Sequence, residues 1–220
     1  MRVLQPVGER GSLMWLQRSV ALRPDLLQPA DLAKIKWLSP TIADNLAEYR
    51  DGAFLERIGQ SRLSPALSEF WPKRGPQWDA LGVAGASPVL VEAKAHLDEL
   101  RSPSTAASAA SRSKIERAFA TVQHALGISD GPVWTARYYQ YANRLAHLWW
   151  LRQNGVDAKL LLVGFVGDTT MRGPSAPQAW EQAYKMADAA LGLSGPNELS
   201  PHVLHVYPDV SLLSEPLSQS

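Results

Sequence analysis

The sequence predicts an α/β sandwich in which a small mixed sheet is flanked by helices. Two short extended runs, at 77–83 and 88–94, surround a glycine-containing turn and are typical of an antiparallel hairpin. An apolar run at 157–167 has the unbroken hydrophobicity of a strand that is buried on both faces. Helical spacing of apolar residues recurs between and around these runs, most clearly at 133–153.

The N-terminal part of the chain is predicted to be helical. Residues 12–40 carry helical spacing in pieces that are interrupted by prolines. Ser39 followed by Pro40 is typical of a helix start, with serine as the cap and proline in the first turn. This pattern predicts a helix over 41–58 that carries Glu48 near its middle.

The second run of the hairpin brings two charged residues together. Successive side chains of a strand point to opposite faces, so Glu92 and Lys94 share one face with Leu90. Asp79 lies on the neighbouring run, and the hairpin brings it to the same place. Two carboxylates and an ammonium group are therefore expected to converge at one edge of the sheet.

The second half of the chain adds helices and a last strand. Helices are predicted to begin at Ser64, Ser113 and Ser175, and a short strand is predicted at 203–207. The helix at 133–153 is apolar around most of its circumference, so we expect it to be buried on most sides. Its one polar stripe consists of Arg137, Gln140, Arg144 and His147.

Composition excludes several classes of protein. The chain has 220 residues and no cysteine, which rules out disulfides and thiolate metal sites. Its net charge is +1, so any binding of nucleic acid must come from a local basic patch and not from bulk charge. No apolar run reaches the about 18 residues of a membrane helix, and the N-terminus lacks the apolar stretch of a signal peptide. We therefore expect a cytoplasmic protein without membrane contact.

The length predicts one domain covering residues 1–220. Within it, the pattern predicts an N-terminal helical extension at 1–40, a core at 41–210 and a tail at 211–220. The Ser- and Ala-rich stretch at 101–113 is too short for a domain linker and is typical of a flexible insertion.

Asp79, Glu92 and Lys94 are the residue types that hydrolysis of a phosphodiester needs. A hard cation neutralises the phosphate and lowers the pKa of the attacking water. Magnesium takes oxygen ligands and keeps several waters, so one or two carboxylates suffice, and the backbone carbonyl of Ala93 would add a ligand. A lysine beside the ion orients or deprotonates the water and offsets developing charge. Glu48 is a candidate for one further ligand.

The segments GPQWDALG (75–82) and PVLVEAKAH (88–96) resemble the PD-(D/E)xK nuclease superfamily, which has the restriction-endonuclease-like fold. The predicted order of helix, strands, helix and strand also fits that superfamily. The resemblance implies that Asp79 and Glu92 bind Mg²⁺ or Mn²⁺ and that Lys94 is the catalytic lysine.

Other positions match the superfamily less well. Glu48 would correspond to the acidic residue that some members carry on the first helix. Trp78 stands where many members have proline. Gln140 is followed four residues later by Arg144, where the exonuclease branch has tyrosine, which argues against that branch. The whole chain, including residues 35–59, also resembles a group of bacterial proteins.

Several side chains around the motif are candidates for contact with the substrate. The basic ones would hold phosphate, and the tryptophan would stack on a base. Each also has a plain structural explanation, as a solvated loop, a core aromatic, a surface histidine or the wet side of a helix. The candidates are Lys73, Arg74, Trp78, His96 and Gln140.

These observations lead to three hypotheses about function. The first is a metal-dependent nuclease that hydrolyses nucleic acid, with DNA as the expected substrate. The second is a nuclease-like fold without activity that binds nucleic acid or acts as a scaffold. The third is that the motif is accidental in some other α/β domain. A homodimer, or a protein partner that delivers the substrate, is left open.

Overall fold

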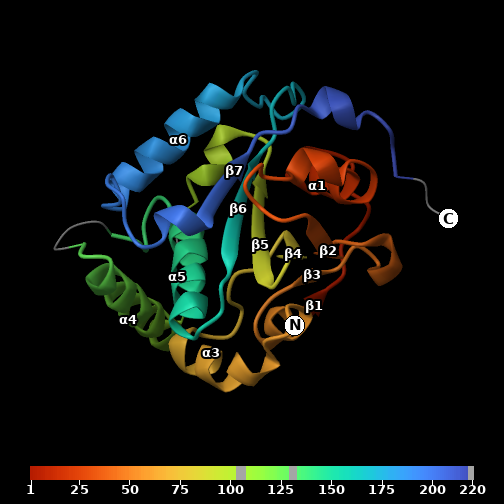
Figure 1. The fold of residues 1–220 in the computed structure, drawn as a ribbon. Coiled ribbons are helices and arrows are strands. Elements are labelled where there is room, and N and C mark those ends of the chain that lie inside the picture. The colour runs from red at the N-terminus through yellow and green to blue at the C-terminus, as the bar shows by residue number, and fades with distance from the viewer. Residues whose placement is uncertain (103–107, 129–132, 218–220) are drawn as a thin grey trace.

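The computed structural model describes residues 1–102, 108–128 and 133–217, and its centre is a five-stranded mixed sheet (Figure 1). The strand order is β2-β4-β5-β6-β7. β4 pairs antiparallel with both β2 and β5, whereas β6 pairs parallel with both β5 and β7. The predicted α/β class is confirmed. The strands are β2 (Ile35–Ser39), β4 (Ala80–Ala84), β5 (Ser87–Lys94), β6 (Lys159–Gly164) and β7 (Val203–Val206).

Helices cover both faces of this sheet. Figure 1 shows α1 on one side and α5 and α6 on the other, and each side has its own apolar core. No helix within the described part of the chain is long and apolar enough to cross a membrane. The helices are α1 (Gly11–Leu22), α2 (Gly52–Arg57), α3 (Ser64–Phe70), α4 (Ala109–Ala125), α5 (Tyr139–Gln153) and α6 (Pro177–Ala190).

The predicted hairpin is confirmed as β4 and β5. Val89 and Val91 lie in the core under α1, whereas Leu90 lies in the core under α5. Glu92 and Lys94 share the face of Leu90, because side chains alternate along the strand. The central strand β6 is buried on both faces, as its apolar run predicts.

The N-terminal helical extension expected at 1–40 is wrong in part. Residues 11–22 are helical, but β2 forms an edge of the sheet, and β1 (Arg2–Val3) pairs with β3 (Glu48–Tyr49). Ser39 ends β2 and is joined to Pro40 by a cis peptide bond, so this pair does not start a helix. A segment of five residues is too short for the spacing of its apolar side chains to distinguish a strand from a helix.

The continuous helix expected at 41–58 is also wrong. Asn45 and Leu46 adopt left-handed backbone angles, with φ of 52° and 53°. Such residues end a right-handed helix. Only α2 is helical in this stretch apart from a short 3-10 turn at 42–44, so Glu48 lies on a strand and not on a helix.

Smaller differences concern where helices begin. α4 starts at Ala109, because the hydroxyl of Ser108 accepts a hydrogen bond from a backbone N–H in the first turn. Ser113 therefore lies inside α4, and the expected loop at 101–113 is helical at its end; residues 103–107 lie outside the described part. α5 and α6 both begin later than predicted, whereas α3 and β7 lie where they were expected.

Candidate functional site

Asp79 is fixed against the backbone of β5, at the residue between Glu92 and Lys94 in sequence. Its backbone N–H donates to the carbonyl of Val91 at 3.2 Å, which continues the hairpin ladder beyond the end of β4. Its Oδ2 accepts a hydrogen bond from the backbone N–H of Ala93 at 2.8 Å. Ala93 lies between Glu92 and Lys94 in sequence, so the carboxylate of Asp79 is held beside both. The predicted convergence of these three residues is therefore present.

Glu92 and Lys94 form a buried ion pair. Lys94 Nζ donates to Glu92 Oε1 at 2.8 Å, and the two residues are 4–5% exposed. Gln140, at the start of α5, accepts a second and longer hydrogen bond from Lys94 Nζ at 3.3 Å. The lysine is thus oriented by β5 on one side and by α5 on the other.

Arg144 is the residue that sequence analysis missed. Its Nε donates to Glu92 Oε2 at 2.6 Å, and a terminal nitrogen donates to the carbonyl of Gln77 at 2.8 Å. Its guanidinium also lies over the ring of Trp78, 4.8 Å from the centroid. The polar stripe on α5 was the signal for it, but Arg144 is 6% exposed and is not the wet side of the helix.

The charges of the site are strongly coupled. Burial, then the charges of Glu92 and Glu48, raises the pKa of Asp79 well above its usual value. Burial works against ionisation of Glu92 too, but Arg144 and Lys94 outweigh it and lower the pKa of Glu92. Burial also opposes the charge of Lys94, but Glu92 outweighs it and raises the pKa of the lysine. At neutral pH, Lys94 is therefore an ammonium and Glu92 a carboxylate.

Glu48 approaches the site from β3. It is 6% exposed, and its Oε2 accepts hydrogen bonds from the side chains of Gln5 and Gln77. Burial raises the pKa of Glu48 to about 7. The hydrogen bond from Gln77 acts against this shift, and the charge of Glu92 adds to it. The expected helix position of Glu48 was wrong, but its electrostatic coupling to Asp79 and Glu92 is present.

Glu48→Gln is expected to change how stability depends on pH. The pKa of Glu48 rises from 4.5 to about 7 on folding, because the folded state holds the proton more tightly. The free energy of unfolding of the wild type therefore falls as pH rises between those two values. The amide cannot ionise, so the variant should gain at most about 3 kcal/mol over wild type above pH 7, and nothing near pH 4. Urea unfolding at several pH values measures this. Glu56→Gln, at an exposed position of α2, is the control; equal pH profiles for Glu48→Gln and wild type would contradict the assignment.

The candidates for substrate contact divide into two groups. Gln140 reaches the site, whereas Trp78 is 0% exposed and packs beneath Arg144, so the expected stacking of Trp78 on a base is wrong. His96 caps a 3-10 turn, and its Nε2 lies 3.4 Å from a carboxylate oxygen of Glu99. Lys73 and Arg74 are exposed on the loop that leads to the hairpin.

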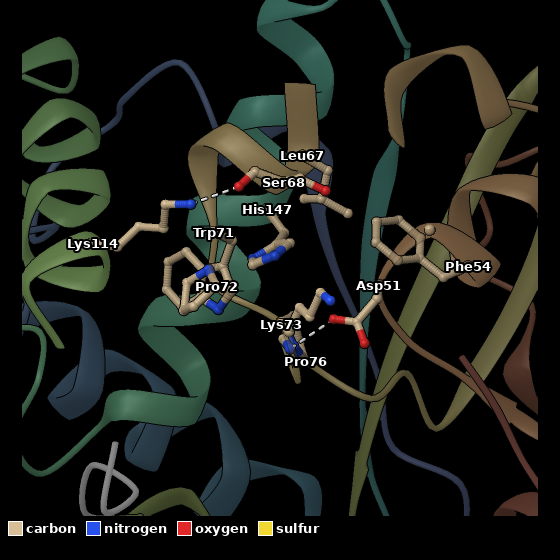
Figure 2. Close-up of a pocket in the computed structure, with 12 residues that line it drawn as sticks. Asp51, Phe54, Leu67, Ser68, Trp71, Pro72, Lys73, Pro76, Lys114 and His147 are labelled. Carbon is tan, nitrogen blue, oxygen red and sulfur yellow. Dashed lines mark hydrogen bonds between the residues drawn. The ribbon is translucent and has the colours of Figure 1, made fainter. Parts of the chain in front are cut away.

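Two cavities carry candidates for substrate contact in their linings, and neither is lined by Asp79, Glu92 or Lys94. One, of about 220 Å³, is lined by residues that include Lys73 and His147 (Figure 2). The other, of about 610 Å³, lies beyond the end of β5. Its lining carries one acidic residue, Asp98, against four that are basic or can become so. These four are Arg10, His96, Arg101 and Arg172.

The acidic residues do not form a ready-made metal cage. Among residues 1–102, 108–128 and 133–217, no group of three or more His, Asp or Glu side chains is arranged to hold an ion. Asp79 and Glu92 offer two carboxylates, and both oxygens of Glu92 are engaged by Lys94 and Arg144. A small ion that keeps most of its waters needs no more than two carboxylates.

Comparisons with known proteins give no relative. No protein-family model matches the chain, and neither a curated protein nor a solved structure matches it.

Proposed function

We propose that this protein is a metal-dependent nuclease with a PD-(D/E)xK site on a restriction-endonuclease-like core. The observation that carries the proposal is the hydrogen bond from the backbone N–H of Ala93, which holds Asp79 beside the ion pair of Glu92 and Lys94. The sheet supports it, since the antiparallel hairpin is followed by the helices α4 and α5 and then by the parallel strand β6. The proposed reaction is hydrolysis of phosphodiester bonds in nucleic acid, with DNA as the expected substrate.

Each residue has a proposed role in this reaction. Asp79, Glu92 and the carbonyl of Ala93 would hold Mg²⁺ or Mn²⁺, which when bound lowers the pKa of water and neutralises charge on the phosphate. The raised pKa of Lys94 keeps its amine protonated, so the lysine orients the water and offsets charge instead of accepting a proton. Gln140 positions Lys94 through their hydrogen bond. Glu48, which is coupled to both carboxylates, is the candidate for a further oxygen near the ion.

The electrostatics favour a cation at this place. Burial and the neighbouring charges of Glu92 and Glu48 all disfavour ionised Asp79. A divalent ion would relieve that repulsion and let Asp79 ionise at neutral pH. Glu92 would have to give up one hydrogen bond from Lys94 or Arg144 to take part, so we expect binding of the ion to loosen this ion pair.

The substrate backbone is proposed to lie along the larger cavity. Within the described residues, Arg10 and Arg172 line it without an acidic partner, and Arg101 is paired only with exposed Asp98. Such unpaired arginines suit phosphate groups, which they bind with salt-dependent affinity. The cavity follows directly after Lys94 in the chain, through His96, so it would deliver a phosphate to the site.

One observation favours the inactive alternative. The carboxylate of Glu92 is buried and both its oxygens are used, as in a structural ion-pair network. In that case the protein would bind nucleic acid through the larger cavity without cutting it. Binding of metal separates the two functions, because only the nuclease needs it.

The test is incubation of the purified protein with single-stranded DNA, duplex DNA and RNA. We expect cleavage of at least one substrate in Mg²⁺ or Mn²⁺ and none in EDTA, because the carboxylates alone cannot activate water. Denaturing gels of end-labelled substrates measure it. Binding without cleavage in any metal would support the inactive alternative, and neither binding nor cleavage would remove both.

A further inference from the structure

The smaller cavity has chemistry that the proposed reaction does not use. It lies among α2, α3, α4 and α5 and the loop that leads to the hairpin (Figure 2). Trp78 connects it to the candidate site, since its ring contacts Arg144 and also lies 6.3 Å from the ring of His147. The rings of His147 and Trp78 would therefore separate an occupant of this cavity from the charged network.

His147 supplies a fixed hydrogen-bond acceptor to this cavity. Its Nδ1 lies 2.8 Å from the carbonyl oxygen of Asn143, which can only accept, so Nδ1 carries the proton and Nε2 has a free lone pair. The residue is 1% exposed, and no described residue donates to Nε2. Burial lowers the pKa of His147 to about 3, which keeps the ring neutral at physiological pH.

Asp51 supplies a second acceptor at the same end of the cavity. Its Oδ1 accepts from the backbone N–H of Gly75 at 3.0 Å. A methyl group on Gly75 would lie 3.6 Å from that oxygen, 3.7 Å from His147 Nε2 and 3.2 Å from Cδ1 of Trp71. Both acceptors therefore lie beside Gly75, and a ligand group that reaches them must bring N–H or O–H donors.

The rest of the cavity has apolar walls and two lysines in its lining. Phe54, Trp71 and two prolines form the walls. Lys73 is exposed at the rim, and Lys114 donates to the carbonyl of Ser68 at 2.6 Å with two further N–H groups to spare. The two lysines disfavour a cationic ligand. They favour a ligand whose negative charge lies near the lysines, outside the apolar part of the cavity.

We propose that this cavity binds a nucleotide, with the N–H edge of its base at Asp51 and His147 and its phosphate at Lys73 and Lys114. Guanine is expected to bind best, because its ring N–H and its amino group are adjacent donors that suit a carboxylate. If the cavity holds one base of a nucleic-acid substrate, the inference rests on the proposed function. Binding of a free nucleotide in the cavity does not depend on catalysis.

The first experiment is calorimetric titration of the full chain in EDTA with guanosine 5′-monophosphate, the other three nucleoside monophosphates, guanosine and spermidine. We expect the guanine nucleotide to bind best and guanosine to bind more weakly. Absence of binding by every nucleotide, or binding of spermidine in their place, would overturn the proposal. Because EDTA prevents cleavage, this result is independent of whether the protein is a nuclease.

Variants locate the binding site. Gly75→Ala puts a methyl group beside the two acceptors and should weaken nucleotide binding about tenfold or more. Gly195→Ala is the matched control, since a methyl group there meets open space. Should Gly75→Ala fail to fold, Lys73→Ala remains, at an exposed position: it should weaken the nucleotide several-fold and leave guanosine unchanged. Unchanged nucleotide binding in both variants would overturn the assignment.

Discussion

Lys94→Ala is expected to reduce the proposed metal-dependent cleavage by about 10²- to 10³-fold, the range that removing one preorganised hydrogen-bond donor costs. The variant removes the ammonium that lies 2.8 Å from Glu92 Oε1 and that Gln140 orients. Glu92 keeps its ion pair with Arg144, so the fold should survive the change. Initial cleavage rates at saturating Mg²⁺, together with urea unfolding of the variant, measure both effects.

The matched control for this prediction is Lys36→Ala, which removes an exposed lysine from β2 and should leave the rate unchanged. Binding of uncut nucleic acid in EDTA should also persist in Lys94→Ala, because the larger cavity keeps its arginines. Cleavage at the wild-type rate by folded Lys94→Ala would show that this lysine is not catalytic. Cleavage at the same rate in EDTA as in Mg²⁺ would point to a contaminating enzyme.

The core of the site could be predicted because it depends on short-range order. Alternation along one strand puts Glu92 and Lys94 on one face, and a tight hairpin puts Asp79 beside them. Both patterns lie within sixteen consecutive residues, and neither depends on distant packing. The strand β6 was predictable for a similar reason, since an unbroken apolar run needs burial on both faces.

The remaining features depend on contacts between distant parts of the chain. Arg144 reaches Glu92 across 52 positions of sequence, and helical spacing alone gives no sign of an ion pair between a helix and a strand. The strand position of Glu48 could not be predicted, because the left-handed residues before it, Asn45 and Leu46, carry no strong local signal. The burial of Trp78 could not be predicted either, because the sequence alone does not show whether an aromatic ring is available to stack on a base.

Arg144→Met is expected to lower the free energy of unfolding by about 3–5 kcal/mol, a large part of the stability of a typical domain. The side chain bridges Glu92 and the carbonyl of Gln77 and covers Trp78, and it is buried with them. Methionine fills much of the volume but leaves the carboxylate of Glu92 with Lys94 as its only described partner. Urea unfolding at neutral pH measures the loss.

Arg137→Met separates this effect from a general loss of charge. Arg137 is exposed and has no ion pair among the described residues, so its replacement should change stability by less than about 0.5 kcal/mol.

The double variant Glu92→Gln with Arg144→Met should lose less stability than the sum of the losses of the two single variants, because neither charge is then left without the other. Additive losses would mean that the two side chains do not act on each other. If Mg²⁺ binds at Glu92, it should restore stability to Arg144→Met more than to wild type, because the arginine no longer competes for the carboxylate.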